Sequence, residues 1–264
     1  MKKYLVIGNP INHSLSPKLH NFWFKQNQIN ATYDKTKLDF NQLKDLILEV
    51  KEKRIDGINI TVPFKNMVIP YLDQLSIEAE KTKSVNTIYL KDKKVIGHNT
   101  DIDGFEKAIN KINFKMNDKK IFILGAGGVV PSIVYALNKM GAINISISNR
   151  TKDKAQKVKD VFKNLNIVDW GEMPEFDVII NATSLGLNKN DKIKLDFSSV
   201  GNNKLFYDVI YNPSETNFLK IGKNLGNKCE NGKLMFIYQA FSAFKLWHDV
   251  EPKINDETIK LLDQ

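Results

Sequence analysis

The sequence predicts an α/β protein with two domains, and three observations carry that prediction. The chain has 264 residues, of which 42% are hydrophobic, enough for two modest cores because domains usually span roughly 100–200 residues. Short apolar runs alternate with amphipathic stretches through the first hundred residues. An apolar run at 119–124 then leads into a glycine-rich turn and a helical pattern. We therefore expect a first domain with a mostly parallel sheet and a second, doubly wound domain.

In the first domain, apolar strands alternate with helices. Residues 4–7 predict a buried strand, and Ser16 followed by Pro17 predicts the N-cap and first turn of a helix that ends near Asn27. Apolar residues then recur every three or four positions, which predicts a helix over about 41–53. Further strands are expected at 57–62, 87–89 and 95–97.

The second domain opens with a complete strand, glycine turn, helix and strand. After the strand at 119–124, a helix is expected over 129–140, closed by Gly141, and a strand over 143–148. Strands at 178–181 and 205–209 extend the sheet, and 103–117 connects the domains. The tail at 235–247 is apolar on nearly all sides, which predicts a buried helix.

Composition excludes several classes of protein. The longest apolar runs fall far short of the roughly 20 residues that a membrane-spanning helix needs, and residues 1–8 read as a strand and not as a signal peptide. The single cysteine, Cys229, is expected to pack in the interior, and its isolation fits a reducing compartment such as the cytoplasm. The four histidines have no metal-ligand spacing, so we expect no metal.

The net charge of +9 raises the question of nucleic-acid binding. The lysines are dispersed along predicted helices, without the clustered basic and aromatic residues of a nucleic-acid surface. A solvated surface is the better interpretation, and its positive field favours small anionic ligands.

The glycine-rich turn is the first candidate site. Gly125, Gly127 and Gly128 follow a strand and precede a helix, where glycines let a pyrophosphate approach the backbone at the positive end of the helix. Val130 stands where a third glycine is usual, so this Rossmann-like fingerprint is a variant.

The end of the next strand indicates which dinucleotide binds. Arg150 can form forked hydrogen bonds to a 2′-phosphate, Thr151 can donate its hydroxyl, and Lys154 adds charge. We therefore predict NADP over NAD. In the alternative interpretation, Thr151 only caps a helix and the two basic side chains are solvated.

Polar segments of the first domain fall at strand ends and loops, where α/β folds bind ligands. Taken singly, Ser16 has a structural role as a cap, Lys65 as a solvated cation and Asp101 as the start of a turn. Together, the runs HSLSP, NITVPFK, VNT, NTD, LGAGG, NRT, NATSLG and YDVIYNP, with a late Gln239-Ala240, resemble the shikimate dehydrogenase family over nearly the whole chain.

The resemblance implies the reaction and the residues that carry it. It implies an oxidoreductase that uses NADPH to reduce 3-dehydroshikimate reversibly to shikimate, in the chorismate pathway of aromatic amino acid biosynthesis. Lys65 and Asp101 match the catalytic pair. The predicted substrate-binding residues are Ser14, Ser16, Asn59, Thr61, Asn86, Tyr211 and Gln239. The predicted cofactor-binding residues are Gly125, Ala126, Gly127, Gly128, Val129, Asn149, Arg150, Thr151, Lys154, Ser184, Val209 and Gly232.

These roles suit the chemistry of a polyhydroxylated ring acid. Serine and tyrosine hydroxyls can donate to its carboxylate, and amide or carboxylate groups can bind its hydroxyls. Hydride delivery leaves negative charge on oxygen, which the Lys65 ammonium can stabilise and protonate. An ionised Asp101 beside it would favour the charged lysine. In the reverse direction, both Lys65 and Asp101 remain candidates for the proton transfer.

The resemblance also divides the chain. It implies a substrate-binding α/β domain over 1–102, a linker helix over 103–117, an NADP-binding Rossmann-like domain over 118–234, and C-terminal helices over 235–264 that return to the first domain. The sequence departs from the family at Lys83-Ser84, His98 and Lys233-Leu234, which affects loop geometry and no catalytic group.

Three alternatives remain open at this stage. A paralogue that also oxidises quinate, often with NAD, differs in substrate breadth, and Arg150 argues against NAD. A non-catalytic NADP-binding protein would need neither Lys65 nor Asp101. Nucleic-acid binding is the least favoured. A monomer and a homodimer are both compatible with the sequence.

Overall fold

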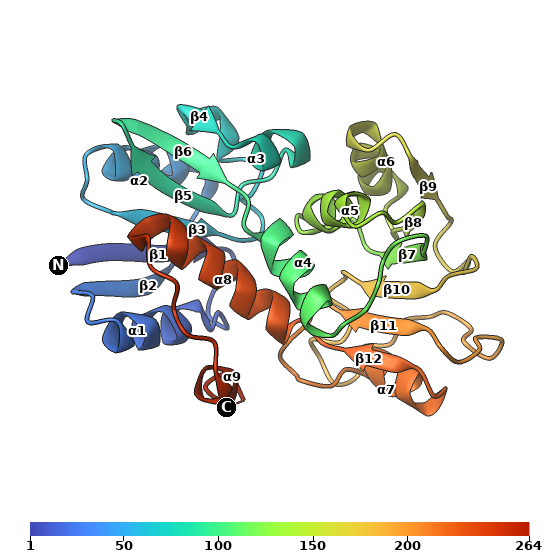
Figure 1. Ribbon diagram of the computed structural model, residues 1–264. Helices are drawn as coiled ribbons and strands as arrows, with labels where there is room; N and C mark the ends of the chain where they lie inside the picture. The colour runs from blue at the N-terminus through green and yellow to red at the C-terminus, as the bar shows by residue number, and fades with distance from the viewer. Residues whose placement is uncertain (264) are drawn as a thin grey trace. The chain divides into compact units, whose positions relative to one another are not determined.

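The computed structural model describes residues 1–263 and shows two six-stranded sheets, one in each of two units of the chain (Figure 1). Unit 1 comprises residues 1–104 and the C-terminal segment from Ile237, and unit 2 comprises Phe105–Phe236. Helices accompany both sheets, so the predicted α/β fold class is confirmed.

Unit 1 holds a mixed sheet with the strand order β2-β1-β3-β5-β6-β4. Strand β1 pairs in parallel with β2 and β3, and β4 pairs in parallel with β6. Strand β5, by contrast, runs antiparallel to both β3 and β6. The strands are β1 (Lys2–Gly8), β2 (Ala31–Lys37), β3 (Gly57–Ile60), β4 (Gln74–Leu75), β5 (Thr87–Lys91) and β6 (Lys94–His98).

The hairpin of β5 and β6 has a local cause. Asp92 and Lys93 join the two strands, and their φ angles of 50° and 63° place both in the left-handed region. Consecutive positive φ values are typical of tight hairpin turns, and a link of this length cannot cross over to a parallel strand. The predicted strands 87–89 and 95–97 therefore exist, but as antiparallel neighbours.

The helices of this part of the chain include one whose start differs from the prediction. Helix α1 begins at Ser16, with Leu15 as its N-cap and no side-chain capping bond, so the prediction that Ser16 is the cap is wrong. Instead, the Ser16 backbone N–H donates to Ser14 Oγ at 3.3 Å. The helices of unit 1 are α1 (Ser16–Gln26), η1 (Phe40–Gln42), α2 (Leu43–Lys51), η2 (Ile69–Tyr71), α3 (Ile77–Thr82) and α9 (Asp256–Lys260). Two further helices, α4 (Asp101–Lys111) and α8 (Lys233–His248), have residues in both units.

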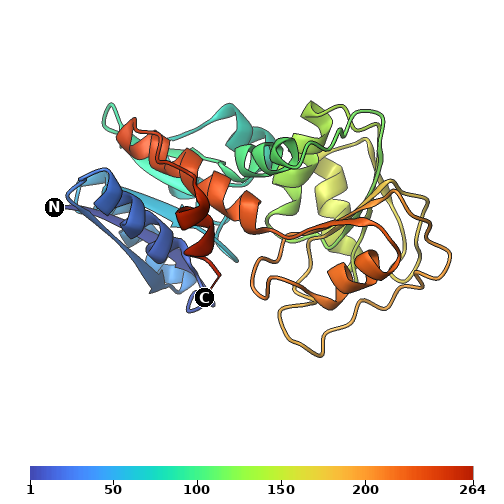
Figure 2. The same ribbon diagram turned by 60° about the horizontal axis from the view of Figure 1, so that its bottom comes forward.

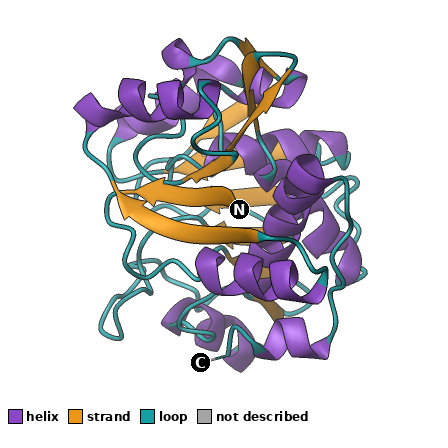
Figure 3. Cartoon of the chain, turned by 90° about the vertical axis from the view of Figure 1, so that its left-hand side faces the viewer, coloured by secondary structure: helices purple, strands orange, loops and turns teal. Residues whose placement is uncertain are grey.

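Helix α8 packs against the sheet of unit 1 beside α1 (Figure 2). Phe244 contacts Phe24 of α1, and Trp247 contacts Tyr4 of β1 and donates its Nε1–H to the carbonyl of Ile88 at 3.1 Å. This confirms the predicted return of the last long helix to the N-terminal domain. Figure 3 faces this unit, with its strands in orange between purple helices.

A histidine lies inside this aromatic layer. His20 is fully buried, and its ring stacks on Tyr33 with centroids 4.3 Å apart. Neither ring nitrogen has a hydrogen-bond partner among the described residues. Burial, and then the nearby His248, lower the pKa of His20 to about 3, so the ring is neutral at physiological pH.

Acidification is therefore expected to destabilise the fold through His20. Below its ordinary pKa of 6.5, the unfolded chain takes up a proton that the folded chain does not, so the free energy of unfolding falls as the pH drops toward 3. At about pH 5 the loss is on the order of 2 kcal/mol. Tm measured between about pH 5 and 8 should depend less on pH in His20→Phe than in the wild type. The control is His13→Gln, which changes an exposed histidine and should keep the pH dependence of the wild type. Equal pH dependence in His20→Phe would contradict this assignment.

Unit 2 holds a fully parallel sheet with the order β12-β11-β10-β7-β8-β9. The order reverses between β10 and β7, as in doubly wound folds, whose ligands bind beyond the carboxyl ends of the strands at this point. The strands are β7 (Lys120–Leu124), β8 (Asn144–Ser148), β9 (Leu165–Ile167), β10 (Val178–Asn181), β11 (Leu205–Asp208) and β12 (Lys228–Glu230). The accompanying helices are α5 (Val130–Lys139), α6 (Lys152–Val161) and α7 (Asn217–Asn224).

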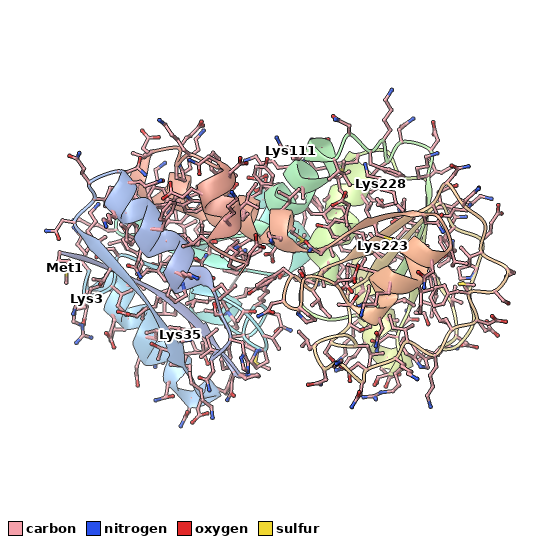
Figure 4. All side chains as sticks on the ribbon, turned by 90° about the horizontal axis from the view of Figure 1, so that it is seen from below. Met1, Lys3, Lys35, Lys111, Lys223 and Lys228 are labelled. Carbon is pink, nitrogen blue, oxygen red and sulfur yellow. The ribbon has the colours of Figure 1, made fainter. Side chains whose placement is uncertain are left out.

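The surface carries the dispersed charge that the sequence predicts. The lysines labelled in Figure 4 are exposed and come from five different elements of the two units. None of the helices within residues 1–263 has the length and hydropathy needed to cross a membrane. Over the same residues, no group of three or more histidine, cysteine or acidic side chains is arranged to hold a metal ion.

Candidate active site

A buried ion pair forms the centre of the candidate site in unit 1. Lys65 Nζ lies 2.5 Å from Asp101 Oδ2, and the two side chains are only 11% and 9% exposed. Lys65 belongs to the turn after β3, and Asp101 is the first residue of α4, directly after the segment that follows β6. A charge removed from water needs a partner, and here each member of the pair supplies one.

Asn86 holds the other oxygen of the same carboxylate. Its Nδ2 donates to Asp101 Oδ1 at 2.9 Å, and it also lies 3.5 Å from Oε1 of Gln239 on α8. The distance to Gln239 is at the long end for a hydrogen bond, but it places the amide of α8 beside the pair. The structure thus brings together Lys65, Asp101, Asn86 and Gln239, four of the predicted site residues, from four separate segments.

The hydroxyl residues of unit 1 follow β1 and β3. Ser14 Oγ lies 3.3 Å from Ser16 Oγ, and the backbone N–H of Thr61 donates to the carbonyl of Ile7 at 2.9 Å. A Cβ on Gly8 would lie 2.5 Å from Thr61 Cγ2, so only glycine lets the two strand ends approach this closely. Because parallel strands end at the same edge of the sheet, this edge positions the side chains of the candidate site.

Asn59 uses its polar atoms within the protein. Its Nδ2 donates to the Asn86 carbonyl and to Thr87 Oγ1, and its Oδ1 accepts from the Tyr33 hydroxyl at 2.6 Å. The role of Asn59 in contacting substrate stays a prediction. Sequence reasoning assigned no role in the site to Tyr33 or Thr87. Thr87 belongs to the VNT run and begins a predicted strand, and this position was the signal available in the sequence.

His98, a departure from the family pattern, supports the turn that leads to Asp101. Its Nδ1 accepts from the backbone N–H of Asn99 at 2.6 Å and lies 3.2 Å from Ser76 Oγ. Burial lowers the pKa of His98, which favours the neutral ring, and the Asn99 N–H that donates to Nδ1 places the remaining ring proton on Nε2. His98 thus has hydrogen-bonding contacts on both sides of this turn, to Asn99 and to Ser76.

In unit 2, the glycine turn connects β7 to α5 at the switch point of the sheet. Gly125 has a φ of 103°, and a Cβ there would lie 2.7 Å from the carbonyl oxygen of Ala182. The backbone N–H of Ala126 donates to Asn149 Oδ1 at 3.2 Å, which ties the turn to the end of β8. Val129 is the N-cap of α5 and makes no side-chain capping bond. The N–H groups of Val130 and Ser132 donate to the carbonyls of Gly127 and Val129, so an anion here would meet the preceding glycine turn and the positive end of the helix dipole.

The predicted 2′-phosphate residues follow β8. Arg150, Thr151 and Lys154 are all exposed. Thr151 is the N-cap residue of α6, but its side chain makes no capping hydrogen bond. The structure therefore shows no capping bond from the Thr151 hydroxyl, whereas the exposure of Arg150 and Lys154 agrees with the solvated side chains of the alternative interpretation.

The remaining predicted residues of unit 2 lie after β10, β11 and β12. Ser184 is exposed, and Tyr211 stacks on Phe236 with ring centroids 4.5 Å apart. A Cβ on Gly232 would lie 2.1 Å from the carbonyl oxygen of Val209, so the chain requires glycine here. Tyr211 belongs to unit 2, whereas the other predicted substrate-binding residues belong to unit 1.

Asp208 organises these loops, and sequence reasoning missed it. This fully buried carboxylate accepts from Thr216 Oγ1 at 2.6 Å, from Asn181 Nδ2 at 3.1 Å and from the backbone N–H of Ile210 at 3.0 Å. Burial raises the pKa of Asp208 to about 6, against the opposing effect of these bonds. Asp208 thus ties together the loops that follow β10 and β11.

Comparison with known proteins identifies the family. Residues 6–88 match the family described as "Shikimate dehydrogenase substrate binding domain", and residues 106–202 match "Shikimate / quinate 5-dehydrogenase". A relative from Pelagibacter ubique (strain HTCC1062), named shikimate dehydrogenase (NADP(+)), is 55% identical over 262 residues, which cover 99% of each chain.

Solved structures agree with the sequence relatives. The crystal structure of shikimate dehydrogenase from Aquifex aeolicus has a TM-score of 0.90 at 34% identity, covering 99% of this chain and 97% of that one. The enzyme from Thermus thermophilus, in complex with NADP(H) and shikimate, has a TM-score of 0.90 at 28% identity, covering 99% and 98%. The sequence, the sheet topology and both halves of the chain lead to one assignment: the protein belongs to the shikimate dehydrogenase family.

Proposed function

We propose that this protein reduces 3-dehydroshikimate to shikimate with NADPH, reversibly, as a step of chorismate biosynthesis. The reaction class and the NADP cofactor are those of its relatives, named shikimate dehydrogenase (NADP(+)). The observation in this chain that carries the proposal is the buried Lys65–Asp101 pair, because a binding protein needs no desolvated ammonium beside a carboxylate. The activity, the oxidoreductase class and the cofactor predicted from the sequence are those of the family.

Lys65 and Asp101 are the proposed catalytic residues. NADPH, when bound, supplies the hydride that reduces the ketone carbon. The ketone oxygen becomes a hydroxyl by taking a proton from Lys65 Nζ, and the resulting amine regains a proton from solvent. Asp101, held by Asn86, keeps Nζ in place through the 2.5 Å contact.

The other side chains of unit 1 are proposed to position the substrate. The hydroxyls of Ser14 and Ser16 donate to the carboxylate, with Tyr211 as the contribution of unit 2, while Thr61, Asn86 and Gln239 bind ring hydroxyls. Residue by residue, this assignment rests on the match to the family motifs and on the proximity of Asn86, Gln239 and Asp101.

Residues of unit 2 are proposed to hold NADP. The turn from Gly125 to Val129 and the start of α5 fit a pyrophosphate, and Asn149 supports that turn. Arg150, Thr151 and Lys154 fit the 2′-phosphate. The proposed set of cofactor-binding residues also includes Ser184, Val209 and Gly232. We accordingly propose unit 1 as the substrate domain and unit 2 as the cofactor domain.

The substrate is a small molecule, and the cellular setting and assembly are further proposals. We place the protein in the cytoplasm, because its one cysteine, Cys229, is unpaired and suits a reducing compartment. Monomer and homodimer both remain compatible with the proposed site.

The decisive experiment follows NADPH absorbance after 3-dehydroshikimate is added to the purified protein. Rapid loss with NADPH and little loss with NADH is the expected result. 3-Dehydroquinate is the matched control, because the description of one matching family includes quinate. A control with a second ketone also matters because a solved structure that is 26% identical, with a TM-score of 0.90, is named 5-ketofructose reductase. Absence of turnover despite NADPH binding would overturn the proposed function.

A further inference from the structure

A row of buried polar side chains lies behind the Lys65–Asp101 pair, and the mechanism above does not use it. Tyr33 and Thr87 are 0% exposed, and Asn59 between them is 6% exposed. Buried polar groups are costly unless they are hydrogen-bonded, so the partners of these side chains decide what the row does.

The orientation of each amide in the row is determined by a neighbour whose role is unambiguous. Asn59 Nδ2 lies 3.1 Å from the backbone carbonyl of Asn86, which can only accept, so Asn59 Oδ1 faces the Tyr33 hydroxyl. Asn86 Oδ1 accepts the backbone N–H of Thr100 at 2.7 Å, so Asn86 Nδ2 faces Asp101. Burial raises the pKa of Tyr33, so its hydroxyl keeps the proton that it donates.

These orientations leave one direction for the Thr87 hydroxyl. Thr87 Oγ1 accepts from Asn59 Nδ2 at 2.9 Å, and the nearest group that can only accept is Asn86 Oδ1, at 3.0 Å. The Thr100 hydroxyl is farther, at 3.2 Å. Donors therefore point the same way along the row, from Tyr33 through Asn59, Thr87 and Asn86 to Asp101.

The other end of the row reaches the hydroxyls assigned to the substrate carboxylate. Ser16 lies close enough to Tyr33 to lower its pKa against the larger effect of burial, and Ser14 Oγ lies 3.3 Å from Ser16 Oγ. The proposed carboxylate subsite and the proposed catalytic pair thus lie at the two ends of the row, and all of these residues belong to unit 1.

We propose that Tyr33 and Thr87 are positioning residues, which orient the Asp101 carboxylate toward Lys65 through Asn59 and Asn86. The proposal rests on the function proposed above. Aligned hydrogen bonds polarise one another, so each donor strengthens the next, and the last of them, from Asn86, holds Asp101 Oδ1 and leaves Oδ2 to Lys65. Neither Tyr33 nor Thr87 contacts the reacting atoms in this scheme.

Thr87→Val tests the proposal by removing one hydroxyl with little change of shape. We expect kcat for 3-dehydroshikimate to fall about fivefold, as for the loss of one neutral hydrogen bond, with a smaller change in KM. Thr87→Ser should restore most of kcat because it restores the hydroxyl. Thr258→Val removes another fully buried threonine hydroxyl, from α9, and should lower Tm without changing kcat.

A double-mutant cycle with Tyr33→Phe separates a connected row from independent effects. If the row acts through Thr87, Tyr33→Phe lowers kcat in the wild type and has little further effect in Thr87→Val. Additive losses, or an unchanged kcat in Thr87→Val, would overturn the inference. The wild-type assay distinguishes failure of this inference from failure of the proposed function. If the wild type is active and Thr87→Val has the same kcat, only this inference is wrong. If the wild type is inactive, the proposed function is wrong.

Discussion

Lys65→Met is expected to lower kcat for 3-dehydroshikimate by about 10²–10⁴-fold, the range for loss of a positioned general acid. Methionine keeps most of the length and apolar stem of lysine but carries no proton and no charge. Because Lys65 is proposed to act on the ketone oxygen as negative charge develops there, its loss should affect kcat far more than KM. Steady-state kinetics with varied 3-dehydroshikimate at saturating NADPH measure both parameters.

Two further variants separate the functions of the ammonium. Lys65→Arg retains the positive charge beside Asp101 but gives up a proton much less readily, so it should bind substrate and remain slow. Lys81→Met changes an exposed lysine of α3 in the same unit and should leave kcat unaltered. Turnover of Lys65→Met close to that of the wild type would remove Lys65 from the mechanism.

Features with strong local signals could be predicted from the sequence. The strand β10 lies at the predicted residues, and β7, α5 and β8 lie within one residue of their predicted bounds, because their apolar patterns end at polar or glycine residues that mark the bounds. Strand β2 was missed, because its sequence ATYDKTK is polar and pairs on one side only, at the edge of the sheet. Such an edge strand gains its stability from its neighbour and not from its own pattern.

The candidate site shows the same division between local and long-range information. The motifs identify Lys65 and Asp101, but their 2.5 Å contact joins residues 36 positions apart and required the fold. Ser16 has the residue type of an N-cap, yet it is already helical, and its hydroxyl oxygen accepts from the Ser14 hydroxyl instead. The row of polar side chains through Thr87 could not be predicted from the sequence. Each of its residues is a common polar residue in its own segment, and only the fold brings their side chains into hydrogen-bonding distance.

Arg150→Ala is expected to raise KM for NADPH by about 10–100-fold, as for the loss of charge-assisted hydrogen bonds to a phosphate. The guanidinium is exposed at the end of β8, where a 2′-phosphate is expected and an NAD ribose has none. KM for NADH should therefore change little, and the preference for NADPH over NADH should fall by nearly the full factor. Initial rates with each nucleotide, at saturating 3-dehydroshikimate, measure this ratio.

A matched charge loss distinguishes a specific contact from the general positive field. Lys157→Ala removes one exposed positive charge from α6, the helix that begins just after Arg150, without touching the proposed phosphate site. If Arg150 binds the 2′-phosphate directly, Lys157→Ala changes KM for NADPH only slightly, because exposed charges are screened within about 10 Å at ordinary salt. If Arg150→Ala raised KM for NADPH and NADH equally, the residue would act on a part that both nucleotides share, and the 2′-phosphate assignment would pass to Thr151 and Lys154.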